Sequence, residues 1–273
     1  MSDTTIITPG DKLPVEDITT VKTTIGPGIY KKPQSQQLIP SSAGVFHHIA
    51  NTSSTSTSKP TQLLYIESNT KRYIPHNNDF VIGLVVGTIG ENYKVALQAG
   101  SIPVLLGFYA FANASKKNRP LVKNGDLVYG RITNDTVEID NEMECVDASG
   151  KEAGFGVLDD LGFVFDVNLN FARELLFNKN SVFLELLALK CKFEIAIGIN
   201  GKIWIKCGEG VGKKDGGAVA AQEDEDQEMK DAGEDDGVKD LKNTLAAVNF
   251  LTRCQHVTQD KLKEELNKAF RGV

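Results

Sequence analysis

The chain has 273 residues, 41% of them hydrophobic and 24% charged, a balance typical of soluble globular proteins and long enough for two or three small domains. It contains no apolar run of about eighteen residues, and its first residues do not place a charged region before an apolar core, so we expect neither a membrane span nor a secretory signal. Four cysteines lie 46, 16 and 47 positions apart without a CxxC pair, which predicts free thiols and excludes a typical zinc site or dense disulfide framework.

The net charge of −6 hides an uneven distribution. Residues 222–240 carry ten acids and two lysines, a net charge of −8, and removing them from the total leaves +2. Residues 71–131 carry eight Lys and Arg against three acids, a net charge of +5. Because local charge governs the attraction of phosphate, the region 71–131 is the part expected to attract it. The acidic stretch is typical of a solvated, disordered insertion, expected at about 208–240.

Residues 1–68 are predicted to form a small β domain. Pro and Gly at 9–11 and 25–30 separate short extended segments, and Leu63–Ile66 is an apolar strand. The low-complexity tract SSTSTS at 53–58 is expected at a loop tip.

Residues 69–150 are predicted to form a small β-barrel. The apolar run at 80–87 contains two glycines, which favours a buried, strongly curved strand. Further strands are expected at 91–97, 127–132 and 137–145, with turn residues between them. This spacing is typical of the five-stranded OB fold.

Residues 151–273 mix helices and strands. Apolar residues at helical spacing predict helices at 168–178 and 241–251, a short one at 183–189, and a last one after Thr258. The predicted fold class is therefore multidomain and mainly β, with an α+β C-terminal domain.

A short loop beside a predicted strand concentrates positive charge, because Lys116, Lys117 and Arg119 lie within four positions. OB barrels bind single strands with basic side chains along the backbone and aromatic rings under the bases. These cations are therefore candidates for RNA binding, together with Tyr93 and Lys94 in a neighbouring strand. Two simpler interpretations stay open: the cations face only solvent, and Tyr93 packs in the core.

Gly198, Asn200 and Gly201 form a GxxG motif, which in KH domains lies between two helices and clamps the nucleic-acid backbone. Here the motif divides the alternating run 192–206, and Asn-Gly in that position favours a β-hairpin turn. The clamp stays as the less favoured alternative. Trp204, the only tryptophan, is expected to pack this hairpin against a neighbouring module.

Signals for catalysis are missing from the sequence. It holds four histidines and no HExxH, GxSxG or P-loop motif. Asp159 and Asp160 are adjacent carboxylates that we expect in a turn. We therefore predict a protein that is not an enzyme and that binds no metal or other cofactor.

Nine collinear segments resemble those of a known family. They are PGD at 9–11, IGPGIY at 25–30, RYIPHNNDFVIG at 72–83, YKVAL at 93–97, NASKKNRP at 113–120, GDLVYGRI at 125–132, AGFGVLDD at 153–160, VNLNFARELLFN at 167–178 and IGINGKIWIKC at 197–207. The family is the RNA exosome cap subunit called ribosomal RNA-processing protein 40, or exosome component 3. The SSTSTS tract and the acidic insertion depart from its pattern but leave these motifs intact.

The resemblance implies an N-terminal domain, an S1-type OB barrel and a KH-type domain in a non-catalytic subunit. With other cap subunits it would bridge a ring of RNase PH-like proteins and guide single-stranded RNA into the central channel. A separate 3′→5′ exonuclease would then act in rRNA maturation, RNA turnover and surveillance. Lys116, Lys117 and Arg119 would contact phosphates, and the GxNG motif would be structural. The nucleus, the nucleolus and the cytoplasm are the expected compartments.

Two alternatives remain from the sequence. One is a purely structural subunit that bridges the ring without direct RNA contact and pairs its loop cations with acids on a neighbour. The other is a stand-alone OB-type RNA-binding protein.

Overall fold

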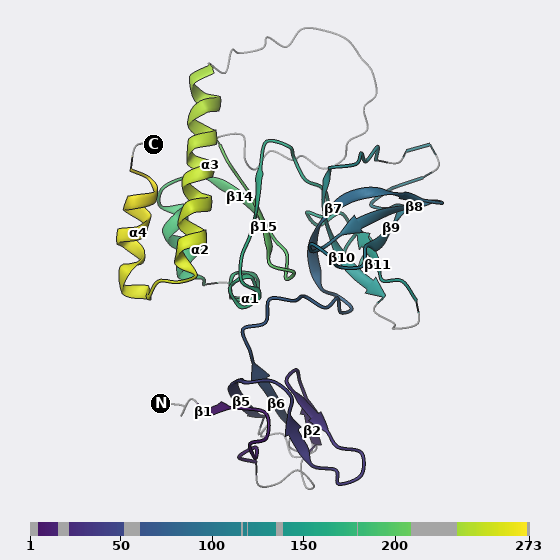
Figure 1. The fold of residues 1–273 in the computed structure, drawn as a ribbon. Helices are drawn as coiled ribbons and strands as arrows, with labels where there is room; N and C mark the ends of the chain where they lie inside the picture. The colour runs from purple at the N-terminus through teal and green to yellow at the C-terminus, as the bar shows by residue number, and fades with distance from the viewer. Residues whose placement is uncertain are drawn as a thin grey trace. The chain divides into compact units, whose positions relative to one another are not determined.

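The computed structural model describes residues 5–15, 22–51, 61–115, 117–118, 120–134, 139–178, 180–208 and 234–271. The chain divides into two compact units, Met1–Thr70 and Lys71–Val273 (Figure 1). Each unit has its own hydrophobic core. No helix in the described ranges is both long enough and apolar enough to cross a membrane.

The first unit is a β domain, as predicted. Four strands form a sheet in the order β1-β5-β6-β2, and two more pair separately as β3-β4. The strands are β1 Thr5–Ile7, β2 Lys22–Ile25, β3 Ile29–Lys31, β4 Leu38–Pro40, β5 Gly44–Asn51 and β6 Thr61–Glu67. Alternate residues of β6 point to one side, so that Leu64 and Ile66 are buried together with Phe46 of β5. The predicted loop tip at 53–58 lies outside the described residues.

The second unit begins with a closed five-stranded barrel, which confirms the predicted OB fold (Figure 1). Its strands are β7 Phe80–Ile89, β8 Asn92–Ala96, β9 Val104–Phe111, β10 Leu127–Asn134 and β11 Glu142–Cys145. The strand β11 closes the barrel because it pairs in parallel with β9 and antiparallel with β10. Two details differ from the prediction: β9 was not foreseen, and β11 begins at Glu142, several residues after the predicted start at 137.

The glycines of β7 explain its curvature. A Cβ atom on Gly83 would lie 2.1 Å from Cγ1 of Val95, so only glycine lets β8 approach this closely. The register between β7 and β8 shifts between Val85 and Gly87, which marks a bulge. A bulge increases the local bend that a small barrel needs to close.

The remainder of the second unit is an α+β domain, as predicted. Three strands form a sheet in the order β13-β15-β14, and the helices pack against it. The short strand β12 Gly156–Val157 still belongs to the barrel sheet, where it pairs with β10. The elements of the α+β domain are β13 Phe163–Asp166, α1 Leu169–Phe177, α2 Val182–Ala188, β14 Phe193–Ile197, β15 Lys202–Cys207, α3 Glu234–Cys254, η1 Gln259–Lys261 and α4 Leu262–Ala269. Along β15 the side chains alternate, so that Ile203 and Ile205 join the helix-covered core while Trp204 points to the opposite side.

The helix α3 corrects the predicted limits of the acidic insertion. We expected disorder over 208–240 and a helix at 241–251, but α3 begins at Glu234. The last part of the stretch that was expected to be disordered is therefore helical. Residues 209–233 lie outside the described part of the chain.

Candidate nucleic-acid interface

The loop from β9 to β10 carries the predicted cation cluster. Within it, Ser115 and Asn118 exchange backbone hydrogen bonds of 2.8 and 3.1 Å, and the Ser115 hydroxyl also accepts the Asn118 N–H. This small turn presents Lys117, whose side chain is exposed. Lys116 and Arg119 lie outside the described residues. The structure therefore places one of the three cations, at the surface of a hydrogen-bonded turn.

The last part of the loop, just before β10, is fixed by packing and by hydrogen bonds. Val122 is buried in the barrel core. The Asp126 carboxylate accepts the Lys123 N–H at 2.7 Å, and the Gly125 N–H donates to the Val85 carbonyl at 2.8 Å. Gly125 has a φ of 100°, a conformation that favours glycine. Backbone bonds to β7 thus restrict how far the loop can move.

Tyr93 is a core residue and not an exposed stacking platform. Its side chain is 6% exposed, and its ring lies 4.6 Å from the ring of Phe108. Its hydroxyl donates a long hydrogen bond of 3.5 Å to the carbonyl oxygen of Pro120. This burial agrees with the packing interpretation that the sequence left open, and a contact of Tyr93 with RNA stays a prediction. Through its hydroxyl, Tyr93 contacts the cation loop at Pro120.

Lys94 follows Tyr93 on β8 and points to the opposite side. Its side chain is partly exposed, and no ion pair joins it to any residue of the described ranges. Its role in RNA binding stays a prediction.

Two exposed side chains near the loop were not foreseen from the sequence. Tyr109 on β9 is 41% exposed, and Lys123 is exposed before β10. Tyr109 lies two residues before the end of β9, where the loop begins. Alternation along β9 would not have revealed this, because Tyr109 and Phe111 are two positions apart and yet one is exposed and the other buried.

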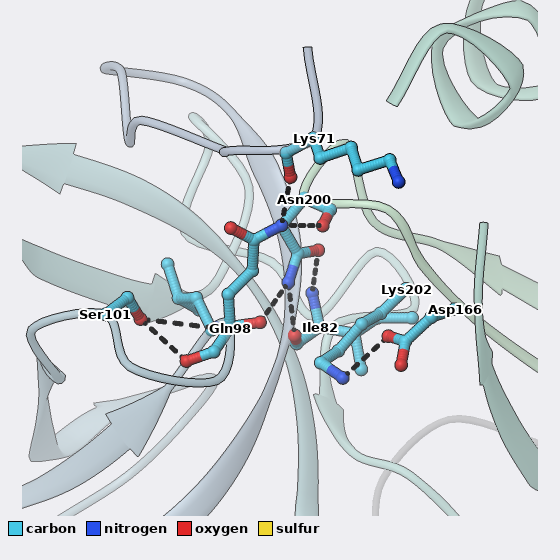
Figure 2. Close-up of polar contacts among 8 residues, drawn as sticks. Lys71, Ile82, Gln98, Ser101, Asp166, Asn200 and Lys202 are labelled. Atoms are coloured by element: carbon cyan, nitrogen blue, oxygen red, sulfur yellow. Dashed lines mark hydrogen bonds and ion pairs between the residues drawn. The ribbon is translucent and has the colours of Figure 1, made fainter. Parts of the chain in front are cut away.

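The GxNG motif forms the turn of the hairpin β14–β15, as predicted, and it also joins the hairpin to the barrel. Asn200 is 1% exposed. Its amide nitrogen donates to the carbonyl oxygens of Ile82 and Leu97 at 2.8 and 2.9 Å, and its Oδ1 accepts the Ile82 N–H at 3.2 Å (Figure 2). One side chain therefore satisfies three backbone groups of β7 and of the segment after β8.

The glycines of the motif are required by close packing. A Cβ on Gly198 would lie 2.8 Å from the backbone nitrogen of Ile82, and Gly201 has a φ of 81°. The Ile199 N–H also donates to the Phe80 carbonyl at 2.8 Å. The turn is therefore packed directly against β7, which favours a structural role over the clamp.

Gln98 extends the same network, and sequence reasoning missed it. Its amide nitrogen donates to the carbonyls of Lys71 and Asn200 at 3.2 and 3.3 Å (Figure 2). Its Oε1 accepts the Tyr73 N–H at 3.0 Å. Next to this network Lys202 pairs with Asp166 at 2.9 Å.

Trp204 packs the hairpin against the barrel, as predicted. It is 2% exposed and forms a cluster with Ile82 and Ala196, which Tyr129 and Val164 border. Its indole N–H donates to the carbonyl of Asp159 at 3.2 Å. That carbonyl also accepts the Gly162 N–H, which confirms the expected turn at 159–162. Barrel and α+β domain therefore share a buried, hydrogen-bonded junction.

No group of three or more His, Cys, Asp or Glu side chains in the described ranges is arranged to hold a metal ion. The four cysteines are free thiols, and burial raises the pKa of Cys254 to about 12.

Three protein-family models match the chain, one for each predicted domain. Their descriptions are "Exosome complex exonuclease Rrp40 N-terminal domain" at residues 23–72, "Exosome complex component RRP40, S1 domain" at 73–156, and "KH domain" at 162–211.

Curated relatives match over most of the chain. Exosome complex component RRP40 of Saccharomyces cerevisiae is 51% identical over 206 residues, which cover 75% of this chain and 82% of that protein. The Drosophila melanogaster protein of the same name is 35% identical and covers 74% and 82%. The Schizosaccharomyces pombe protein is also 35% identical and covers 72% and 79%.

Proposed function

This chain belongs to the RRP40 family of exosome complex components, and on that premise we propose that it is a non-catalytic cap subunit that guides single-stranded RNA into the channel of an exosome. The observation that carries the proposal is the pairing of S1 and KH domains with a cation-bearing loop fixed to the barrel. Its partners would be RNase PH-like ring subunits, other cap subunits and a 3′→5′ exonuclease. Its compartments would be the nucleus, the nucleolus and the cytoplasm.

The loop suits this task for an electrostatic reason. Threading requires contacts that hold the RNA backbone and let it slide, and phosphate contacts do this because they do not depend on base sequence. Hydrogen bonds to β7 and from Tyr93 fix the described part of the loop, which includes Lys117. Lys116, Lys117 and Arg119 would provide the phosphate contacts, and Lys94 and Lys123 would add to them.

The ring of Tyr109 is the better candidate for stacking on a base. Stacking on an exposed aromatic ring is tolerant of sequence, so it also fits RNA that moves through a channel. Tyr109 is the exposed aromatic side chain that β9 places just before the cation loop.

The shared junction supports a rigid role for the hairpin. A subunit that bridges ring neighbours must transmit position from one domain to the next. The Asn200 bonds and the Trp204 cluster fix the α+β domain to the barrel, and hence to the loop.

The deciding experiment is purification of the tagged chain from its own cells at moderate salt, followed by RNA crosslinking within the purified complex. We expect stoichiometric exosome subunits and a crosslink on the peptide that contains residues 113–123. Exosome subunits without a crosslink on this peptide would favour the purely structural subunit. A chain that purifies alone or with ribosomes would contradict the assignment to an exosome.

The absence of catalysis has its own test. The purified chain incubated with magnesium and single-stranded RNA is expected to leave the RNA intact, whereas the assembled complex degrades it. Decay by the chain alone, retained through successive purification steps, would overturn the non-catalytic assignment.

A further inference from the structure

Two of the four cysteines lie together at the open end of the hairpin β14–β15. Cys207 is the last residue of β15, and Cys191 lies between α2 and β14. Their sulfur atoms are 3.7 Å apart. Cys145, by contrast, is buried in the barrel core, and Cys254 ends α3. The sequence separation of 16 residues does not predict this pair, which depends on the strand register.

The backbone around the two thiols is held by the sheet. Phe193 lies opposite Cys207 in the β14–β15 register, and the Gly208 N–H donates to the Lys192 carbonyl at 3.3 Å. On the other side, the Cys207 N–H donates to the buried hydroxyl of Thr244 on α3 at 3.1 Å. The two sulfurs, 3.7 Å apart, are already in contact, and a disulfide brings them to about 2.05 Å.

The two thiols are chemically different. The hydrogen bond between the two thiols lowers the pKa of Cys207 and raises the pKa of Cys191. Cys207 is therefore the sulfur that ionises first. Cys191 is only partly buried, so the pair contacts solvent on its side, whereas Cys207 is 3% exposed. A low-pKa thiol beside a second thiol is the arrangement of a nucleophile and a resolving cysteine.

We propose that Cys191 and Cys207 are an oxidisable dithiol that a hydroperoxide converts into a disulfide within the chain. The Cys207 thiolate attacks one oxygen of hydrogen peroxide, the O–O bond breaks, and the hydroxide released takes up the proton lost from Cys207 as water. Cys191 then attacks the sulfenic sulfur of Cys207, the S–O bond breaks, and the leaving hydroxide takes the Cys191 proton as a second water. Two electrons from the two sulfurs thus reduce one peroxide.

The disulfide would close a ring that contains the whole hairpin, including the turn that carries Asn200. The turn is already fixed to β7 at the closed end, and the bond would fix the open end beside α2 and α3. Because a cross-link reduces the freedom of the unfolded chain, oxidation should stabilise the second unit and slow opening of β14 from β15. This inference does not depend on RNA binding.

The test uses the purified, reduced full-length chain and stepwise additions of hydrogen peroxide. After each step the chain is denatured, the remaining thiols are blocked with N-ethylmaleimide, and the peptides are mapped by mass spectrometry. We expect a Cys191–Cys207 cross-linked peptide pair, reversed by dithiothreitol, at peroxide levels that leave Cys145 and Cys254 alkylated. We also expect the oxidised chain to melt several degrees higher than the reduced chain.

The matched variant is Cys191→Ser, which changes one atom at the less buried member of the pair. Its oxidation should stop at the Cys207 sulfenic acid, which dimedone traps, and the rise in melting temperature should vanish. Oxidation of Cys145 or Cys254 at the same peroxide level, a bond between two chains, or equal dimedone trapping in wild type and variant would overturn the proposal. If the reduced variant fails to melt cooperatively, the peptide map of the wild-type chain decides alone.

Discussion

Two polar segments of the second unit, the β9–β10 loop and the GxNG turn, differ in where their hydrogen-bonding groups point. In the loop, Ser115 and Asn118 bond each other, and the Lys117 side chain extends into solvent. In the turn, Asn200 is buried and its amide makes three bonds to backbone groups of the barrel. The polar side chain of the turn is therefore used within the fold, whereas the described cation of the loop stays available to a partner in solution.

The largest loss of stability is expected from Asn200→Ala, which removes the buried side chain of the turn. The change leaves the N–H and C=O of Ile82 and the C=O of Leu97 buried without this partner. Each such group costs roughly 1–3 kcal/mol, so we expect the free energy of unfolding to fall by about 3 kcal/mol or more. Urea denaturation of the full chain measures this loss.

The matched control is Asn168→Ala. Asn168 precedes α1 and makes no side-chain capping bond, so its loss should cost less than about 1 kcal/mol. Equal stability of the two variants would mean that the Asn200 bonds are not a structural junction, and the clamp interpretation of the GxNG motif would return.

A smaller structural effect is expected from Gly198→Ala. The added Cβ would meet the backbone nitrogen of Ile82 at 2.8 Å, and because backbone cannot rotate away, the hairpin must shift. Overpacking of this kind costs roughly 1–3 kcal/mol. The control is Gly87→Ala, since a Cβ on Gly87 meets nothing within 4 Å. A thermal melt in which Gly198→Ala is no worse than Gly87→Ala would contradict the close docking of the turn.

The loop is tested by combining Lys116→Ala, Lys117→Ala and Arg119→Ala. If these side chains neutralise about three phosphates, log K for single-stranded RNA should fall with log salt at a slope of roughly −2 in the wild-type chain. The triple variant should bind about tenfold more weakly (~1.4 kcal/mol), with a slope near zero. Fluorescence anisotropy at several salt concentrations measures both.

A control for charge alone combines Lys261→Ala, Lys263→Ala and Arg271→Ala, three exposed cations at the C-terminal helix. It removes the same charge far along the chain and should leave the RNA affinity within about twofold, since screening weakens distant charges. The loop variant should keep the melting temperature of the wild type. A large thermal loss in the loop variant would show that the cations stabilise the fold instead of facing RNA.

Tyr109→Ala separates stacking from phosphate contact. Loss of one base–aromatic stack costs roughly 1 kcal/mol or more, without a change in the salt slope, because no charge is removed. Since the ring is 41% exposed, stability should change little. If the RNA affinity of this variant does not change, Tyr109 does not stack on RNA and the loop binds RNA through its cations alone.

The sequence predicted the hairpin turn because Asn-Gly between alternating apolar runs is a local signal. It could not predict the partners of Asn200, since Ile82 and Leu97 lie more than a hundred positions earlier, with separations of 118 and 103 residues. The strand β9 was missed because Gly107 interrupts its apolar run and no polar residues alternate with the apolar ones to reveal a strand. Tyr93 and Lys94 were both predicted as RNA contacts. Adjacent residues of a strand face opposite sides, so only one of these two side chains faces outward.

The smallest effect is expected from Tyr93→Phe, and it tests how the loop is supported. The variant keeps the ring that packs on Phe108 and removes only the 3.5 Å bond to Pro120, so the free energy of unfolding should fall by less than about 1 kcal/mol. If that bond holds the loop in place, hydrogen exchange of the amides at 115–118 should accelerate, and RNA affinity should fall slightly with an unchanged salt slope. If neither changes, the backbone bonds of Gly125 and Lys123 alone fix the loop, and Tyr93 contributes only apolar packing.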